Sequence, residues 1–230
     1  MTAEAATCAR DKTGSAFEPA YLRLMRSGEL AERARAARAH LENCDLCARY
    51  CRVDRLRSTR GAVCRTGERA VVHSAGPHFG EEDCLSGSRG SGTIFFSSCN
   101  LRCIYCQNWE IAWQGEGQEA SDEELAQMML RLQAQGCHNI NFVTPSHVVA
   151  QILAAVKIAA EQGLRLPLVY NTSGYDSPEA LALLGGVIDI YMPDMKYGDD
   201  KSARRYSHLR DYVASTRLAC ARCIGKLAIW

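Results

Sequence analysis

The sequence predicts an α/β fold of partial-barrel type, preceded by an N-terminal extension that is helical and rich in cysteine. Segments with the patterns of strands and helices alternate four times from residue 93 onward, as a parallel sheet with right-handed crossovers requires. The 12 cysteines among the 230 residues are clustered, with four between residues 44 and 64 and three between residues 99 and 106. With no secretory signal ahead of them, clustered cysteines indicate metal sites more often than disulfides.

The bulk composition excludes several functional classes. A formal net charge of +1 indicates neither a nucleic-acid-binding surface nor an acidic tail. No apolar stretch is long enough to span a bilayer, and the first 15 residues carry charges and lack the apolar core of a signal peptide. We therefore expect a cytoplasmic protein that binds neither nucleic acid nor membranes.

Residues 1–90 are expected to form the N-terminal extension. Apolar residues recur at helical spacing from Leu30 to Leu41, which predicts a helix over residues 17–41 with its arginines on a solvated face. Residues 44–90 contain the first cysteine group and scattered glycines, and we expect them to be loop-like.

Residues 91–213 contain the alternating strands and helices. Short apolar runs predict four strands, and capping residues or glycines bound the helices between them. Ser121 begins one helix, Glu124 completes its capping box, and Gly136 ends it. The predicted strands cover residues 93–97, 139–143, 166–170 and 187–192, and the predicted helices begin near residues 121, 148, 178 and 201.

Polar residues follow the carboxyl end of each predicted strand. They are Cys99, Thr144, Asn171 and Asp194. Ligand sites of barrels and of open α/β sheets lie at this edge, because the carboxyl ends of parallel strands meet there. The sequence therefore predicts one polar ligand site built from all four strand ends.

Three cysteines form a C-x3-C-x2-C run directly after the first predicted strand: Cys99, Cys103 and Cys106. Soft thiolates suit iron–sulfur clusters, and three of them would hold three irons of a cubane. The fourth iron would stay open to a ligand, which suits catalysis better than simple electron transfer. A three-thiolate zinc site and unligated thiols are the alternatives, but a closed zinc site needs four ligands and no histidine lies nearby in sequence.

This run and its surroundings resemble a known family. With Tyr105 ahead of its last cysteine, the run is similar to the signature of radical S-adenosylmethionine (SAM) enzymes. Residues 95–108, 138–145 and 191–197 further resemble the subfamily related to pyruvate formate-lyase activating enzymes. The resemblance extends from about residue 20 to about residue 213. It implies that residues 91–213 form a radical SAM partial barrel.

The resemblance also implies a chemistry. In this superfamily a [4Fe–4S] cluster chelates SAM at its open iron, and an electron from the cluster cleaves SAM to methionine and a 5′-deoxyadenosyl radical, which takes a hydrogen atom from the substrate. An electron donor such as flavodoxin or ferredoxin is implied, and so is an activated protein substrate of glycyl-radical type. Modification of a small molecule or peptide is one alternative. An iron–sulfur module without SAM chemistry is another.

The same resemblance implies which residues contact SAM, and no catalytic acid or base is assigned. Three segments take the places of the Gly-Gly-Glu, Asp-Thr-Asn-Gly and Asp-x-Lys segments of activating enzymes, the last two of which contact SAM and a monovalent cation. The first departs from the Gly-Gly-Glu pattern, so the contact with the SAM amino group is altered. The candidates are Thr144, Ser146, Asn171, Thr172, Asp194 and Lys196. Without the resemblance, the alternate positions of Asp194 and Lys196 at a strand's carboxyl end indicate either a site for a polar ligand or a structural ion pair.

A second group of four cysteines precedes the motif: Cys44, Cys47, Cys51 and Cys64. Four thiols suit structural zinc or a second iron–sulfur cluster, and spacing does not choose between them. Four unligated thiols are the remaining alternative. We expect a metal with a structural role.

Residues 214–230 form an atypical tail with no further strand–helix unit. Only four such units are visible, whereas relatives in this superfamily usually have six. We therefore expect a barrel that is incomplete at its C-terminal side, with its fourth strand open at the edge and catalysis impaired by truncation. The alternative is that the tail folds back over this edge or that a partner covers it.

Overall fold

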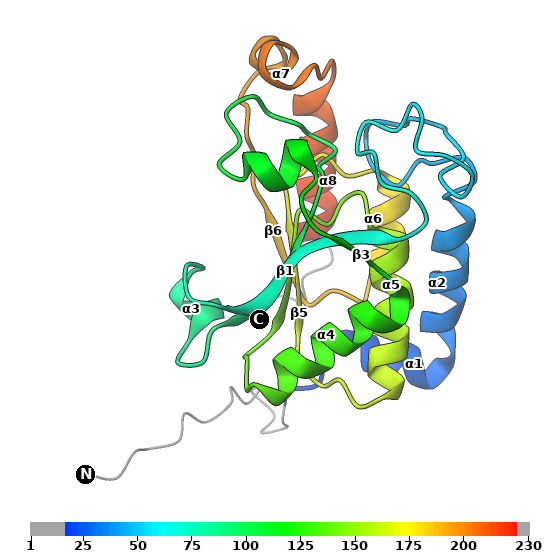
Figure 1. The fold of residues 1–230 in the computed structure, drawn as a ribbon, viewed down its shortest axis with the longest axis vertical. Helices are drawn as coiled ribbons and strands as arrows, with labels where there is room; N and C mark the ends of the chain where they lie inside the picture. Colours follow the sequence, from blue (N-terminus) through cyan, green and yellow to red (C-terminus); the bar gives the residue numbers. More distant parts are fainter. Residues whose placement is uncertain (1–16, 225–230) are drawn as a thin grey trace.

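The computed structural model describes residues 17–224, which form an α/β fold around one open sheet (Figure 1). Within these residues the sheet has six strands in the order β3-β1-β2-β4-β5-β6 and does not close into a barrel. This confirms the predicted partial (β/α) barrel. The strands are β1 (Ala70–His78), β2 (Ser91–Phe96), β3 (Gln118–Ala120), β4 (Ile140–Val143), β5 (Leu168–Thr172) and β6 (Ile190–Pro193).

The four predicted strands are present and parallel. They are β2, β4, β5 and β6, with each neighbouring pair in parallel register. Their carboxyl ends consequently point to the same edge of the sheet, the upper end in Figure 1. This shared direction is what brings the predicted polar residues together.

The interpretation of residues 70–78 as loop was wrong, because they form β1. This strand pairs antiparallel with β2 from Val72↔Phe96 to His78↔Ser91, and with β3 over its first three residues. Its outer half contains Gly76 and Pro77, which have low strand propensity. Pairing with the edge of β2 therefore decides its conformation, and the local sequence does not.

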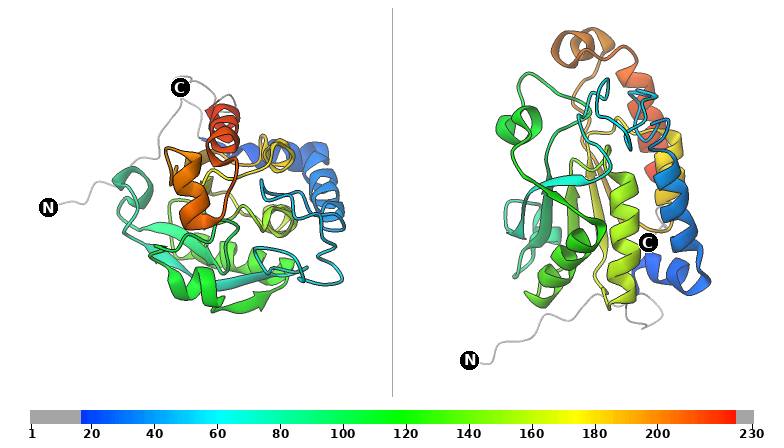
Figure 2. Two further views of the ribbon diagram at one scale, coloured as in Figure 1. Left: turned by 90° about the horizontal axis from the view of Figure 1, so that it is seen from above. Right: turned by 45° about the vertical axis from the view of Figure 1, so that its right-hand side comes forward.

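The helices follow the predicted alternation and cover one side of the sheet (Figure 2). Ser121 caps α4 with the predicted capping box, and Ser177 accepts from the Ala180 N–H at the start of α6. Helix α5 is buried on nearly all sides, because it packs against α4 and lies between the sheet and α2 (Glu29–Ala39) (Figure 2). The helices of this layer are α4 (Asp122–Ala134), α5 (Val149–Glu161) and α6 (Pro178–Leu184).

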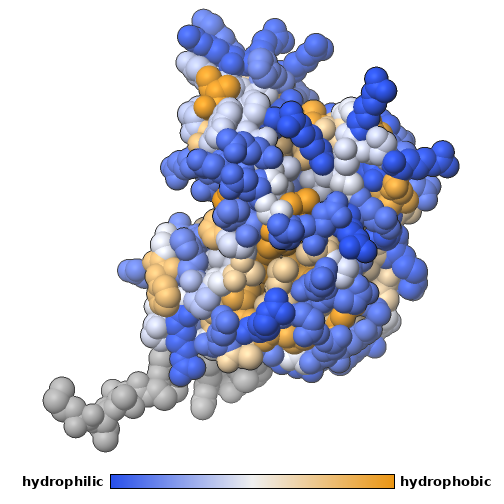
Figure 3. Space-filling view, viewed as in Figure 1, coloured by the Kyte–Doolittle hydropathy of each residue, from blue (hydrophilic) through white to orange (hydrophobic). Residues whose placement is uncertain are grey.

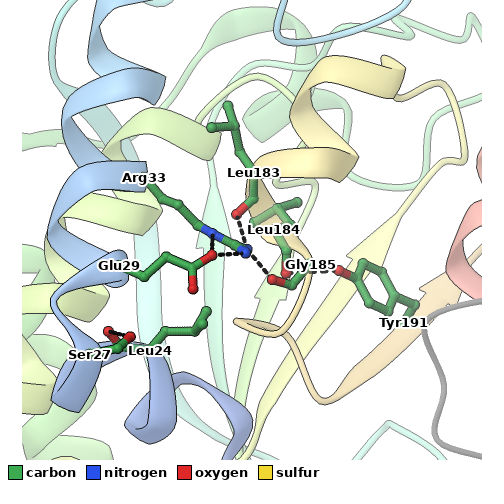
Figure 4. A network of polar contacts seen from close by, with 8 residues as sticks. All are labelled: Leu24, Ser27, Glu29, Arg33, Leu183, Leu184, Gly185 and Tyr191. Carbon is green, nitrogen blue, oxygen red and sulfur yellow. Dashed lines mark hydrogen bonds and ion pairs between the residues drawn. The ribbon is translucent and has the colours of Figure 1, made fainter.

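The helix predicted over residues 17–41 is two helices, α1 (Ala20–Ser27) and α2 (Glu29–Ala39). Gly28 separates them with a left-handed φ of 82°, a conformation that glycine adopts without strain. Arg33 of α2 pairs with Glu29 and donates to the carbonyls of Leu183 and Gly185 at the end of α6 (Figure 4). The extension is thereby tied to the sheet domain.

One π-helix and three α-helices complete the described fold. They are α3 (Asp83–Ser86), the π-helix η1 (Glu110–Gln114), α7 (Asp200–Ser207) and α8 (Tyr212–Ile224). Residues 214–224 of the predicted tail thus continue a helix, and its Ala219 and Cys223 belong to the main core. This part of the tail folds back onto the domain, while residues 225–230 lie outside the described part.

Strand β6 pairs only with β5 among the described residues, so it is an edge strand as expected. Its Tyr191 side chain is buried and donates to the carbonyl of Leu184 at 3.1 Å.

Between residues 17 and 224, every helix is too short or too polar for a membrane crossing.

Candidate active site

A cleft of about 540 Å³ opens at the carboxyl ends of the parallel strands. Its walls include all three cysteines of the C-x3-C-x2-C run and five of the six residues that the resemblance implied for SAM. These residues are Cys99, Cys103, Cys106, Thr144, Asn171, Thr172, Asp194 and Lys196. The sixth, Ser146, is buried and reaches the cleft only through Thr172, with 2.9 Å between their hydroxyl oxygens.

The cysteine loop presents its thiols from a largely buried position. Cys99 and Cys103 are buried and Cys106 is half-buried. Burial raises the pKa of Cys99 to about 11, although the N–H groups of Arg102 and Leu101 act in the opposite direction. Burial also raises the pKa of Cys103. A metal would have to displace these thiol protons, so thiols in this setting suit a cation that binds sulfur strongly.

Backbone strain and side-chain contacts fix the shape of this loop. Ser98 and Arg102 have left-handed φ values of 68° and 54°, which non-glycine residues rarely adopt. The Arg102 guanidinium lies 4.2 Å from the Trp113 ring centre and donates to the Val63 carbonyl. Trp113 Nε1 in turn donates to the Cys103 carbonyl at 3.0 Å. The loop is therefore held from both sides.

Arg49 links the N-terminal extension to the same loop. Its Nε donates to the Asn100 carbonyl at 2.7 Å, and one terminal nitrogen donates to Leu101 and Ser207 at 3.0 and 2.8 Å. The other terminal nitrogen donates to the His208 carbonyl at 3.1 Å. A planar guanidinium can serve several carbonyls at fixed angles. The loop and the end of α7 thus share one anchor.

Thr144 marks the cleft wall after β4. Its φ of 61° is left-handed, which is unusual for a β-branched residue, and its N–H donates to the Asn171 carbonyl at 3.1 Å. Strain of this kind collects at functional sites, where the surrounding structure maintains it. The segment that departs from the Gly-Gly-Glu pattern is therefore held in a specific conformation beside the cleft.

A buried carboxylate lies under the cleft at Asp176. It accepts from the Thr172 hydroxyl at 2.6 Å and from the Tyr170 hydroxyl at 2.9 Å. Because the Thr172 proton goes to Asp176, the Ser146 hydroxyl is left to donate to Thr172. Burial raises the pKa of Asp176. Sequence reasoning missed this residue, because its role depends on side-chain contacts with Thr172 and Tyr170 that belong to no sequence motif.

Asp194 and Lys196 form an ion pair and also line the cleft. Both are exposed, so the pair leaves their charges accessible to a ligand. The backbone around them is fixed: Asp194 N–H donates to the Thr172 carbonyl at 2.7 Å, and Lys196 N–H donates to the Tyr212 hydroxyl at 2.7 Å. The ion pair of the second predicted alternative is present, and both of its members lie on the cleft wall, where the first alternative, a polar ligand site, stays a prediction.

Several residues of the cleft wall were not predicted. Gln107 and Asn108 line the cleft and directly follow Cys106, so their place next to the cysteine run could have indicated them. His78 and Glu81 come from the end of β1 and the residues after it, which were taken as loop. They reach the cleft because β1 pairs with β2, a fact that local patterns do not contain.

The four cysteines of the extension line a second, small cavity of about 10 Å³. Arg49, Arg55, Asn100 and His147 contribute to its walls. The pKa of Cys47 is raised, mainly by burial, and the neighbouring thiols of Cys64, Cys44 and Cys51 raise it further. In the part of the chain that the structure describes, no three Cys, His, Asp or Glu side chains converge as ligands around one metal ion.

Comparisons with known proteins agree with this geometry. A family model described as the radical SAM superfamily matches residues 93–229, so the match continues past residue 213, where the resemblance was expected to fade. An uncharacterised protein of Methanocaldococcus jannaschii is 30% identical over 178 residues, 74% of this chain and 50% of that protein. A pyruvate formate-lyase-activating enzyme of Clostridium pasteurianum is 30% identical over 112 residues, 46% of each chain. The chain spans about half the length of these curated relatives.

Proposed function

The chain belongs to the radical SAM superfamily, and from this membership we propose that Cys99, Cys103 and Cys106 hold a [4Fe–4S] cluster and that SAM binds in the same cleft. One observation carries the proposal: three thiols and five polar candidates from separate strand ends line one cleft of about 540 Å³. A fourth cysteine is absent from the described wall of this cleft, which suits a cluster with one iron open to a ligand.

The bound cofactors supply reductive cleavage of a sulfonium C–S bond and abstraction of a hydrogen atom. The chain supplies position and shielding. The buried Cys99 and Cys103 keep water from two of the cluster ligands, and Arg49 and Trp113 hold the loop that presents them.

The polar cleft residues match the charged end of SAM. The Asp194 carboxylate complements an ammonium group, and the Lys196 ammonium complements a carboxylate. Oxygen atoms of Asn171, Thr172 and Asp194 also suit a monovalent cation. Asp176 is a positioning residue, because it orients the Thr172 hydroxyl from below.

We further propose that the substrate is a protein, of the glycyl-radical type, and that the electron donor is a small redox protein such as flavodoxin or ferredoxin. The similarity to a pyruvate formate-lyase-activating enzyme supports a protein substrate. So do exposed apolar side chains beside the cleft residues: Ile104, Tyr105, Trp109 and Met195 are 53%, 50%, 40% and 48% exposed. On the face that the space-filling view draws, small hydrophobic patches lie among hydrophilic residues (Figure 3).

SAM cleavage after anaerobic reconstitution tests this proposal. The protein is loaded with iron and sulfide, reduced with dithionite and assayed for methionine and 5′-deoxyadenosine. We expect both products from the wild-type chain and neither from the Cys99→Ala variant. Addition of a candidate glycyl-radical protein should raise turnover. A wild-type protein that binds a cluster yet forms no 5′-deoxyadenosine would instead favour an iron–sulfur module without SAM chemistry.

A further inference from the structure

The extension brings four thiols to one cavity that the proposed SAM chemistry does not use. Cys44, Cys47 and Cys64 are buried and Cys51 is half-buried, and all four line this cavity. None of them is in a disulfide. Four soft donors around a small cavity, on a segment with little regular structure, are typical of sites where a bound metal maintains the fold.

A buried positive charge adjoins these thiols. Arg55 is 2% exposed and donates to Cys44 Sγ at 3.5 Å and to the Thr66 and Gly67 carbonyls at 2.7 and 3.3 Å. No carboxylate pairs with it among the described residues. A buried guanidinium without an anion is costly. Thiolates bound to a metal keep a net negative charge, which would compensate Arg55 and the nearby Arg49.

A buried nitrogen on the cavity wall has no partner. His147 is 1% exposed, and its Nε2 lies 3.0 Å from the Ser97 carbonyl. Since a carbonyl only accepts, Nε2 carries the proton and Nδ1 keeps a lone pair. Across residues 17–224 this Nδ1 has no hydrogen-bond partner. An unsatisfied buried lone pair of this kind requires an explanation, and a metal in the cavity provides one.

We propose that Cys44, Cys47, Cys51 and Cys64 bind a thiophilic metal centre, a zinc ion or an iron–sulfur cluster, separate from the three-cysteine loop. The four side chains do not converge on one point in this structure, so binding would rotate them inward. His147 adds a nitrogen donor to the same cavity.

The position of this centre gives it a structural effect on the catalytic loop. Asn100, the residue after Cys99, lines the same cavity, and Arg49 lines it while donating to the Asn100 carbonyl. Metal binding would therefore fix the part of the extension that carries Arg49, and through Arg49 it would stabilise the three-cysteine loop. Loss of the metal is expected to loosen the loop without removing any of its own thiols.

Metal analysis of full-length variants tests the proposal independently of SAM cleavage. The chain with Cys99→Ala, Cys103→Ala and Cys106→Ala is purified without oxygen, and its zinc and iron are measured by mass spectrometry. We expect about one zinc per chain, or iron with the visible absorption of an iron–sulfur cluster. Adding Cys47→Ala and Cys64→Ala should lower the content at least 10-fold, whereas adding Cys84→Ala, an exposed thiol outside both cavities, should leave it unchanged.

A second measurement needs no substitution of the four extension cysteines, so it still tests the proposal if the variants lacking Cys47 and Cys64 fail to fold. The triple variant, stripped with a chelator, is titrated with Co²⁺, whose thiolate complexes absorb strongly in the near ultraviolet. Saturable absorption that competes with Zn²⁺ would support a zinc-type site, and retained iron with sulfide would support a cluster. If the triple variant holds neither zinc nor iron and gives no cobalt–thiolate band, the proposal is wrong.

Discussion

Arg49 Nε donates a 2.7 Å hydrogen bond to the backbone carbonyl of Asn100, the residue that follows Cys99. Arg49 belongs to the N-terminal extension and Asn100 to the three-cysteine loop, so the two cysteine groups are mechanically connected. Strand β1 lies in the extension and pairs with β2, which lies on the other side of the expected boundary at residue 90. The extension therefore contributes directly to the shape of the cleft.

Replacement of Arg49 should reduce cluster binding. Arg49→Ala removes four hydrogen bonds to carbonyls, and even one charge-assisted bond is worth about 1.5–3 kcal/mol. We expect roughly a 10-fold or greater loss of SAM cleavage and a lower ratio of iron to protein. Arg49→Lys should recover only part of the SAM cleavage and of the iron content, because lysine lacks the planar guanidinium with its several fixed donors. Arg57→Ala, whose side chain is 88% exposed, is the matched control and should retain both.

Each cysteine of the loop should be essential for SAM cleavage. Cys99→Ala, Cys103→Ala or Cys106→Ala removes one iron ligand, so 5′-deoxyadenosine formation should fall to background in each case. Cys84→Ala is the control, because Cys84 is exposed and lies outside the cleft. Full cleavage in any of the three loop variants would show that the loop does not hold the catalytic cluster.

Asp194 should contribute to SAM affinity. Asp194→Ala removes a carboxylate from the cleft wall, and we expect SAM to bind roughly 10-fold more weakly or worse. Equilibrium binding to the cluster-loaded protein measures this effect. Glu161→Ala removes a carboxylate from the end of α5 and should leave the affinity unchanged. Unaltered affinity in Asp194→Ala, with the cluster intact, would identify the pair with Lys196 as purely structural.

Asp176 should make stability depend on pH. Its pKa in the folded chain is raised above the ordinary 3.8, mainly by burial. The folded state therefore holds this proton more tightly than the unfolded state, and the stabilisation is complete below the ordinary pKa. It is lost as the pH rises through the raised pKa. Urea unfolding of the metal-free chain at a series of pH values should show this decline, and Asp176→Asn should remove it. Identical profiles in the two proteins would contradict the assignment.

The parallel half of the fold could be predicted because its signals are local. The capping box at Ser121 and Glu124 and the cap at Ser177 are present as expected, and apolar runs located all four parallel strands. Strand β1 could not be predicted, because Gly76 and Pro77 disfavour a strand until β2 supplies hydrogen bonds. The break at Gly28 had a visible signal, a glycine inside the helical pattern, which was not used.

The candidate site could be predicted in part for the same reason. The three cysteines and the polar strand ends were found by position, since parallel strands bring their carboxyl ends to one edge. Asp176, Arg49 and His147 were not found. Arg49 and His147 act through Asn100 and Ser97, which are 51 and 50 residues away. Asp176 acts through Thr172, only four residues away, but by a side-chain contact that no sequence motif indicates.

The Tyr212 hydroxyl joins two strand ends: it accepts from the Lys196 N–H at 2.7 Å and donates to the Ser173 carbonyl at 3.0 Å. Tyr212 is the first residue of α8, so the Lys196 amide loses its acceptor whenever this helix detaches. Deuterium uptake at that single amide therefore measures how often α8 leaves the domain. The Lys196 amide thus reports whether α8 stays packed against the domain.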